Sequence, residues 1–412
     1  MKVAYLLTEF PSASETFAAR EIDALIAAGW EVTVLTAGGG AGGTTAPCGP
    51  PCIRRPQRLS RKALTGMAYL CFRYPLSLPK FVALLISVFA ECPREAATLL
   101  GNIHAVGHFA RCLDSMSIRH VHAYFLNWPA CIGMATALLT GRTLSLAGHA
   151  RDIFVERGAI RAKVGAALFV TLCTQEGLKW IEQFLTPEYR ARLTVNRHGV
   201  AVPAATSRPK SRGRFGSKRE DEFQLLAVGR LVPKKGFEHA IRAARILMDR
   251  GLACRLTIVG SGPSRLALAR TVEDLRMGEA VRFEGWVCND HTLDMMLQAH
   301  VLVVPSVIDD EGDRDGIPNA IIEAFALGTP VVASSLPAIC EAVRDGVTGI
   351  LAKPADPGSL ADAVWRIADS PELAEFLSAN GRLLAESDYD PVTNVGRIAA
   401  LLKTACESPC SE

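Results

Sequence analysis

The sequence lacks any apolar run of the roughly 18 or more residues that predicts a transmembrane helix, although 49% of its 412 residues are hydrophobic. Its start also lacks the features of a signal peptide, because the only apolar run there is short and ends in an acid, Glu9. Both absences favour a cytoplasmic protein.

The charge balance lacks a strong excess of one sign, with 45 Lys and Arg residues against 42 Asp and Glu residues. A net charge of +3 does not indicate a nucleic-acid partner. Six cations fall within residues 201–222, together with two prolines, two glycines and a single aromatic residue, Phe215. This composition favours a solvated linker, and no nucleic-acid partner is predicted.

Twelve cysteines are scattered through the sequence without the C-x₂-C spacing of common zinc sites. In the two tightest pairs, Cys48 with Cys52 and Cys406 with Cys410, three residues separate the thiols. A four-cysteine zinc site would require the two ends of the chain to meet. We therefore expect reduced thiols and predict no metal site.

A dinucleotide-binding fingerprint is also missing where an NAD enzyme would need it. The string Gly38 to Gly43 matches G-x-G-x-x-G, but it follows the second predicted strand and residues 44–51, rich in Thr and Pro, do not open a helix. The loop after the first predicted strand is Thr8 to Ser12, which has no glycine. An NAD-dependent function is therefore not favoured.

What the sequence does contain is an alternation of apolar strands with helices. The strands are predicted at residues 2–7, 31–35, 169–172, 223–228, 256–259, 281–285 and 301–304. This alternation is typical of α/β domains with Rossmann-like βαβ units. The length and the linker predict two such domains, residues 1–205 and residues 206–389.

An acid pair follows the strand at 301–304. A helix is predicted from about Ile317, with Pro318 in its first turn, so that Asp315 precedes the helix and Glu323 lies in its second turn. Eight helical residues span about 12 Å, enough to reach from a ribose to a sugar across a diphosphate. The amides of Gly316 and Ile317 would then face the diphosphate. An ordinary βαβ unit with two solvated acids fits this spacing equally well.

Two other loops carry candidate site residues. Arg230 and Lys235 follow the strand at 223–228, and two cations on such a loop can clamp a diphosphate. In the first half, His149 stands three residues before Asp152, directly after a predicted strand. Ligands bind at the carboxyl edge of parallel sheets, although a single histidine there can also be structural.

Together these motifs resemble those of glycosyltransferase family 4, retaining enzymes of GT-B fold. The acid pair with Gly328-Thr329-Pro330-Val331-Val332-Ala333-Ser334 resembles the donor-sugar signature of that family. The strings Gly229-Arg230-Leu231…Lys235-Gly236, Val259-Gly260-Ser261-Gly262-Pro263 and His149-Ala150-Arg151-Asp152-Ile153 match further family motifs. The string Phe10-Pro11-Ser12-Ala13-Ser14-Glu15-Thr16-Phe17 is similar to the first loop of the exopolysaccharide and colanic-acid branch.

The resemblance implies a role for each of these residues. Arg230 and Lys235 would hold the donor diphosphate, Glu323 the ribose hydroxyls, and His149 the transferred sugar. Asp315 stands where the family usually has glutamate, and its side chain is one methylene shorter. It would contact hydroxyls of that sugar. The remaining donor-binding candidates are Gly229, Gly262, Gly316, Ile317 and Pro318, and the cleft or acceptor candidates are Ser14, Glu15, Thr16 and Asp152.

The fold and function follow from the same resemblance. It implies two Rossmann-like domains that face a cleft, with a final helix in residues 390–412 crossing back to the first domain. The expected reaction moves a hexosyl group, with retained configuration, from a nucleotide diphosphate sugar to a saccharide or lipid-linked acceptor in cell-surface polysaccharide biosynthesis. A nucleotide-sugar-binding module without catalysis is the alternative.

No cofactor is expected for this reaction. Asp313-Arg314-Asp315 is a D-x-D string that could hold a metal-bound diphosphate, but Asp315 already has an assigned role and the cations make a metal redundant. The segment 54–90 mixes seven cations with apolar residues and includes an apolar stretch at 81–90. Such a segment fits a buried helix, or a helix at the inner surface of the cytoplasmic membrane.

Overall fold

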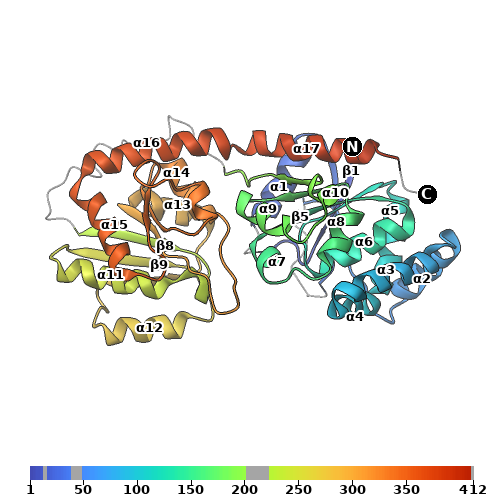
Figure 1. The fold of residues 1–412 in the computed structure, drawn as a ribbon, viewed down its shortest axis with the longest axis horizontal. Helices are drawn as coiled ribbons and strands as arrows, with labels where there is room; N and C mark the ends of the chain where they lie inside the picture. Colours follow the sequence, from blue (N-terminus) through green and yellow to red (C-terminus); the bar gives the residue numbers. More distant parts are fainter. Residues whose placement is uncertain (13–15, 39–48, 201–221, 410–412) are drawn as a thin grey trace. The chain divides into compact units, whose positions relative to one another are not determined.

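The computed structural model describes residues 1–12, 16–38, 49–200 and 222–409. It divides into two compact units, each with its own parallel sheet flanked by helices (Figure 1). Unit 1 contains residues 1–199 and 391–412, and unit 2 contains residues 200–390. The sequence places the domain boundary at residues 205 and 206, which lie outside the described residues, as does most of the predicted linker.

Unit 1 is built on a sheet with the order β3-β2-β1-β4-β5-β6-β7, and all its strand pairs are parallel. The strand order reverses between β1 and β4, which makes a topological switch point of the kind where α/β proteins bind ligands. The strands are β1 (Lys2–Leu7), β2 (Glu31–Thr36), β3 (Cys52–Arg54), β4 (His120–Ala123), β5 (Thr143–Gly148), β6 (Phe169–Leu172) and β7 (Leu193–Val195).

Eleven helices of unit 1 are described: α1 (Thr16–Ala27), α2 (Arg61–Arg73), α3 (Ser77–Glu91), α4 (Pro93–Gly101), α5 (Ile103–Ser115), α6 (Trp128–Thr140), α7 (Ala150–Phe154), α8 (Ile160–Ala166), α9 (Gln175–Glu182), α10 (Pro187–Arg190) and α17 (Pro391–Glu407). Helix α17 buries Ile398 and Leu402 in a core cluster with Tyr5 and Leu25, from β1 and α1. The prediction that the final helix returns to the first domain is therefore confirmed.

Unit 2 has a second parallel sheet, with the order β10-β9-β8-β11-β12-β13 and a switch point between β8 and β11. Its strands are β8 (Phe223–Val228), β9 (Cys254–Val259), β10 (Val281–Gly285), β11 (Val301–Val304), β12 (Val331–Ser334) and β13 (Ile350–Ala352). Its helices are η3 (Pro233–Lys235), α11 (Phe237–Asp249), α12 (Arg265–Asp274), α13 (Asn289–Gln298), α14 (Asn319–Leu327), η4 (Ile339–Glu341), α15 (Pro357–Asp369) and α16 (Pro371–Asp388). The α/β fold class predicted from the sequence is confirmed.

In the described parts of the chain, no single helix is long and apolar enough to cross a bilayer. Helices α2 and α3 meet the requirements of length and hydropathy only when taken together, and a bend of 106° separates them. The stretch at 81–90 was predicted to lie either in the core or at a membrane surface. Helix α3 buries only one side of it, including Phe81, Leu84 and Val88, and leaves Val82 exposed.

Candidate functional site

The loops that follow β8 and β11 meet at the switch point of unit 2. Lys235, at the end of η3 after β8, donates a hydrogen bond from Nζ to Oδ2 of Asp315, which follows β11, at 2.9 Å. Beside it, Nζ of Lys234 donates to Oδ1 of Asp313 at 3.0 Å. The structure thus brings together two residues predicted from distant motifs, Lys235 and Asp315.

Glycines allow these loops to approach so closely. Gly236 adopts a left-handed conformation with φ of +61°, and a Cβ at this position would lie 2.1 Å from the carbonyl oxygen of Pro305, at the end of β11. A Cβ on Gly262 would lie 2.5 Å from the oxygen of Leu231. Only a residue without a side chain fits these positions, which explains the glycines that follow β8 and β9.

The electrostatics of the site are set by burial and pairing. Burial alone would raise the pKa of Asp315, but the Lys235 and Lys234 ammonium groups and the Ser306 hydroxyl outweigh it and hold the pKa below its ordinary value. Oγ of Ser306 donates to Oδ2 of Asp315 at 2.6 Å. The Asp315 carboxylate is therefore ionised at neutral pH and holds the Lys235 ammonium in position through their hydrogen bond.

The acid pair of the sequence is not a pair of solvated carboxylates. Asp315 is 6% exposed and Glu323 is 8% exposed, so that alternative is wrong. Helix α14 begins at Asn319, two residues later than predicted, because Pro318 has an extended ψ of 131° and precedes the helix instead of lying in its first turn. Gly316 and Ile317 accordingly form the turn before the helix.

Unit 1 places its candidates around the carboxyl end of β5. The Asp152 carboxylate is buried and accepts hydrogen bonds from the backbone N–H of His149, at 2.8 Å, and from that of Leu126, in the loop after β4. Burial raises the pKa of Asp152 to about 7, although these backbone bonds oppose the shift. Asp152 thus fixes the position of His149, and a contact of its own with an acceptor stays a prediction.

The His149 imidazole lies among aromatic rings. Its centroid is 5.0 Å from that of Phe17, 5.1 Å from Tyr124, 4.8 Å from Phe125 and 5.2 Å from His198. Within the described ranges, neither of its ring nitrogens has a hydrogen-bond partner. Burial, with smaller contributions from His198 and His122, lowers the pKa of His149 well below its usual value, so the ring is neutral at physiological pH.

Two neighbours of His149 were missed by the sequence analysis. The Cys173 sulfur lies 3.0 Å from Nε2 of His198, and the ligand atoms of His149, Cys173 and His198 all lie within 4.8 Å of one another. A thiolate with two imidazoles suits a soft divalent ion, but burial raises the pKa of the Cys173 thiol well above its usual value and opposes ligation. Cys173 follows β6 and His198 follows β7, so their positions after adjacent strands were the available signal.

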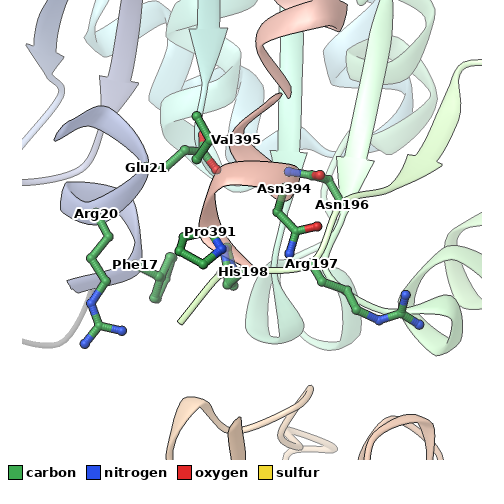
Figure 2. A pocket seen from close by; sticks show the side chains of 10 residues that line it. Phe17, Arg20, Glu21, Asn196, Arg197, His198, Pro391, Asn394 and Val395 are labelled. Atoms are coloured by element: carbon green, nitrogen blue, oxygen red, sulfur yellow. The ribbon is translucent and has the colours of Figure 1, made fainter. Parts of the chain in front are cut away.

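A small pocket of unit 1 lies beside these residues (Figure 2). Figure 2 shows Phe17, His198 and Pro391 together, with Arg20 on one side and Arg197 on the other. The remaining lining residues are Glu21, Asn196, Gly199, Asn394 and Val395. Of the predicted cleft residues in the first loop, Ser14 and Glu15 lie outside the described residues, and Thr16 begins α1.

Comparison with protein families decides the nature of unit 2. Residues 222–370 match the family model described as glycosyl transferases group 1. Unit 2 contains a glycosyl transferase group 1 domain. The Lys235–Asp315 pair, Glu323 and the glycine turns all lie within this glycosyl transferase group 1 domain. Membership of family 4 stays a prediction.

Similar proteins support this identification. WcaL of Escherichia coli K12, named for colanic acid biosynthesis, is 31% identical over 216 residues, which cover 52% of each chain. AmsK of Erwinia amylovora, an amylovoran biosynthesis glycosyltransferase, is 29% identical over 44% of each chain. An α-D-kanosaminyltransferase of Streptomyces kanamyceticus is 30% identical over 57% of this chain and 59% of its own. The matches span about half the length of these curated relatives.

Solved structures confirm the fold around the glycosyl transferase group 1 domain. Anabaena HepE, solved in complex with UDP and glucose, superimposes with a TM-score of 0.71 at 18% identity and covers 98% of this chain and 100% of its own. Sucrose-phosphate synthase from Thermosynechococcus elongatus gives a TM-score of 0.72 at 19% identity and covers 98% of both chains. The GT-B fold predicted from the sequence is therefore confirmed.

Proposed function

We propose that this protein transfers a hexosyl group from a nucleotide diphosphate sugar to a saccharide or lipid-linked acceptor, with retained anomeric configuration. The observation that carries the proposal is the Lys235–Asp315 pair at the β8/β11 switch point. An α/β sheet binds ligands at such a point, and ammonium groups held there can compensate the charge of a diphosphate.

We assign each donor contact from the family resemblance, and the chemistry of the site supports the assignment. Lys234 and Lys235 supply two ammonium groups fixed by buried carboxylates, and Arg230 is exposed on the same loop. We assign Lys235 and Arg230 to the departing diphosphate, whose growing negative charge they stabilise in place of a metal ion. Glu323, buried in α14, is assigned to the ribose hydroxyls. HepE has been solved with UDP-glucose, which supports a donor of this class.

The acceptor side is assigned to unit 1. His149 is assigned to the transferred sugar, because a neutral imidazole whose ring nitrogens have no hydrogen-bond partner among the described residues can exchange hydrogen bonds with sugar hydroxyls. Relatives named for colanic acid and amylovoran biosynthesis support a role in cell-surface polysaccharide assembly. We assign the reaction to the cytoplasmic side of the membrane, where a lipid-linked acceptor would be presented.

The test is an assay of nucleoside diphosphate release. Purified protein is incubated with a panel of nucleotide diphosphate sugars, with and without an extract of polyprenyl-linked saccharides, and the anomeric configuration of any product is determined by NMR. Release that depends on acceptor, with retained configuration, is expected. Inverted product would overturn the retaining mechanism, and donor binding without any transfer would favour the non-catalytic module.

A further inference from the structure

Helix α3 has apolar side chains on two separate faces. One face packs into the core through Phe81, Leu84 and Val88. The residues of the other face follow one another three or four positions apart, and each is 48–68% exposed. They are Leu78, Val82, Ile86 and Phe89. A helix at the surface of a protein in water normally has polar side chains on its outer face, so the second face needs an explanation.

The neighbouring helix also exposes apolar side chains. Leu64 and Phe72 of α2 are exposed, as are Leu59 before it and Leu76 in the bend before α3. With the four side chains of α3, these residues make up eight of the nineteen large apolar side chains that the described part of the chain leaves exposed. We call these eight residues the apolar surface. Figure 1 shows α2, α3 and α4 together at one edge of unit 1.

The position of α2 is fixed by close packing on α5. A Cβ at Gly66 would lie 2.6 Å from the backbone nitrogen of His108, and a Cβ at Gly107 would lie 2.7 Å from the carbonyl carbon of Gly66. The two backbones therefore touch, and no rearrangement of α2 against α5 can bury its outer side chains.

The stretch of chain that carries the apolar surface contains cations but no carboxylate before Glu91, at the end of α3. No Asp or Glu occurs between Glu31 and Glu91, whereas residues 54–80 contain seven cations: Arg54, Arg55, Arg58, Arg61, Lys62, Arg73 and Lys80. Arg61 and Lys62 occupy the first turn of α2, where the helix dipole disfavours cations. Since these cations do not stabilise their own helix, the arrangement points to an anionic partner.

We propose that the apolar surface and its cations dock on a membrane that contains anionic lipids, with α2 and α3 lying in the headgroup region. Apolar side chains interleaved with Lys and Arg are the composition of interfacial helices, and the cytoplasmic leaflet carries negative charge. The 106° bend and the length of each helix fit a position along the interface. A second copy of the chain fits less well, because it would bring the exposed cations of one α2 helix, Arg61, Lys62 and Arg73, against those of the other.

The test is co-sedimentation of the full chain with vesicles, without donor or acceptor, so its result does not depend on the proposed function. The vesicles are phosphatidylcholine alone or mixed with phosphatidylglycerol, at low and high salt. Binding to the anionic vesicles at low salt is expected, with weaker binding at high salt. The variant Val82→Ser/Ile86→Ser/Phe89→Ser should bind at least about tenfold more weakly, and Arg61→Gln/Lys62→Gln/Arg73→Gln about 10²-fold more weakly.

A matched control comes from unit 2, where α12 also exposes a leucine and an arginine. The variant Leu266→Ser/Arg270→Gln should bind vesicles as the wild type does. All the changed side chains are exposed, and circular dichroism melts verify folding. The proposal is overturned if the wild type does not bind anionic vesicles, or if the α3 variant binds as well as the wild type. It is also overturned if the wild type self-associates in sedimentation velocity, the α3 variant is monomeric and neither binds vesicles, because the surface then joins two copies.

Discussion

The Lys235 ammonium and the Asp315 carboxylate form a hydrogen-bonded ion pair at 2.9 Å, although they are 80 positions apart in the sequence. Only the carboxyl ends of β8 and β11, adjacent in the sheet, bring them together. The sequence assigned Lys235 to the diphosphate and Asp315 to the transferred sugar. Because the two side chains are paired, a change to one alters the position and charge of the other.

Removing the Asp315 carboxylate should therefore destabilise unit 2 as well as impair transfer. Asp315→Asn leaves the partly buried ammonium of Lys235 without its countercharge, which should cost about 3 kcal/mol in the free energy of unfolding at pH 7. Asp315→Glu keeps the charge and should recover most of this loss. Urea unfolding of the three proteins measures the effect, and equal stability of Asp315→Asn and wild type would contradict it.

The same pair predicts a pH dependence. The pKa of Asp315 is lowered below 3.8 in the folded protein, so its stabilising contribution is complete above pH 3.8 and is lost as the pH falls through the folded pKa. The stability difference between wild type and Asp315→Asn should stay constant from pH 7 down to about 4 and shrink below that. A difference that already shrinks between pH 7 and 5 would be inconsistent with this pairing.

Gly236 should be needed to position Lys235. A Cβ at Gly236 would meet the Pro305 carbonyl oxygen at 2.1 Å, so Gly236→Ala must displace the loop after β8 from β11. The matched control is Gly346→Ala, because Gly346 has a similar φ of +69° but no atom within 4 Å of the added Cβ. Gly346→Ala should lower the free energy of unfolding by only about 1 kcal/mol, the conformational cost of alanine in the left-handed region. Gly236→Ala should lower the free energy of unfolding by more, and turnover at least about tenfold. Equal losses in the two variants would disprove a close-packing role.

The buried carboxyl group of Glu21, in unit 1, should make stability depend on pH in the opposite direction. Tyr5 and Tyr124 donate to its carboxyl oxygens at 2.8 and 3.1 Å. Burial raises its pKa from 4.5 to about 7, despite the opposing effect of both tyrosines. The folded state then binds a proton that the unfolded state has lost, so stability falls as the pH rises from 4.5 to 7.

Glu21→Gln should remove this penalty, which amounts to about 3 kcal/mol at neutral pH. Its gain in unfolding free energy over wild type should grow from pH 4.5 to pH 7 and stay level above. The wild-type profile alone is not diagnostic, because burial lowers the pKa of His120 and of His122 to about 3 and these groups act in the opposite direction. A gain that is independent of pH would refute the assignment to Glu21.

Chelation tests the proposed absence of a metal from the reaction. Lys234 and Lys235 form ion pairs with Asp313 and Asp315, the two carboxylates of the D-x-D string. Transfer should therefore continue in excess EDTA without added Mg²⁺ or Mn²⁺. Two variants distinguish the candidate ligands if activity is lost. Restoration by Mn²⁺ that Asp313→Asn abolishes would place a metal at the D-x-D string, and restoration by Zn²⁺ that Cys173→Ser abolishes would place one beside His149 and His198.

The strands that were easiest to predict are those buried on both faces. Continuous apolar runs gave the bounds of β1 and β11 as the structure has them, whereas β10 contains Arg282 and Glu284 and is buried only at Val281. Residues 54–115 were harder, because cations and apolar residues alternate there without a single helical face, and α2 and α3 present apolar side chains both inward and outward.

The candidate site was predictable only where a motif is local in sequence. Lys235, Asp315 and Glu323 belong to such motifs. Lys234 and Ser306 gain their roles from side-chain pairing across two loops, which no local pattern records. In the same way, Cys173 and His198 become neighbours only because β6 and β7 pair in parallel.

The most direct test of the account is calorimetric titration of nucleoside diphosphates, such as UDP, ADP and GDP, into wild type, Lys235→Ala, Arg230→Ala and the α12 control Arg270→Ala. The account predicts that at least one of these nucleoside diphosphates binds the wild type and the Arg270→Ala control with equal affinity. The same ligand should bind Lys235→Ala at least about tenfold more weakly, and transfer by either site variant should fall about 10²-fold. Binding that is unchanged in both site variants, or no binding to the wild type by any nucleoside diphosphate, would contradict the central claim that these cations hold the donor diphosphate.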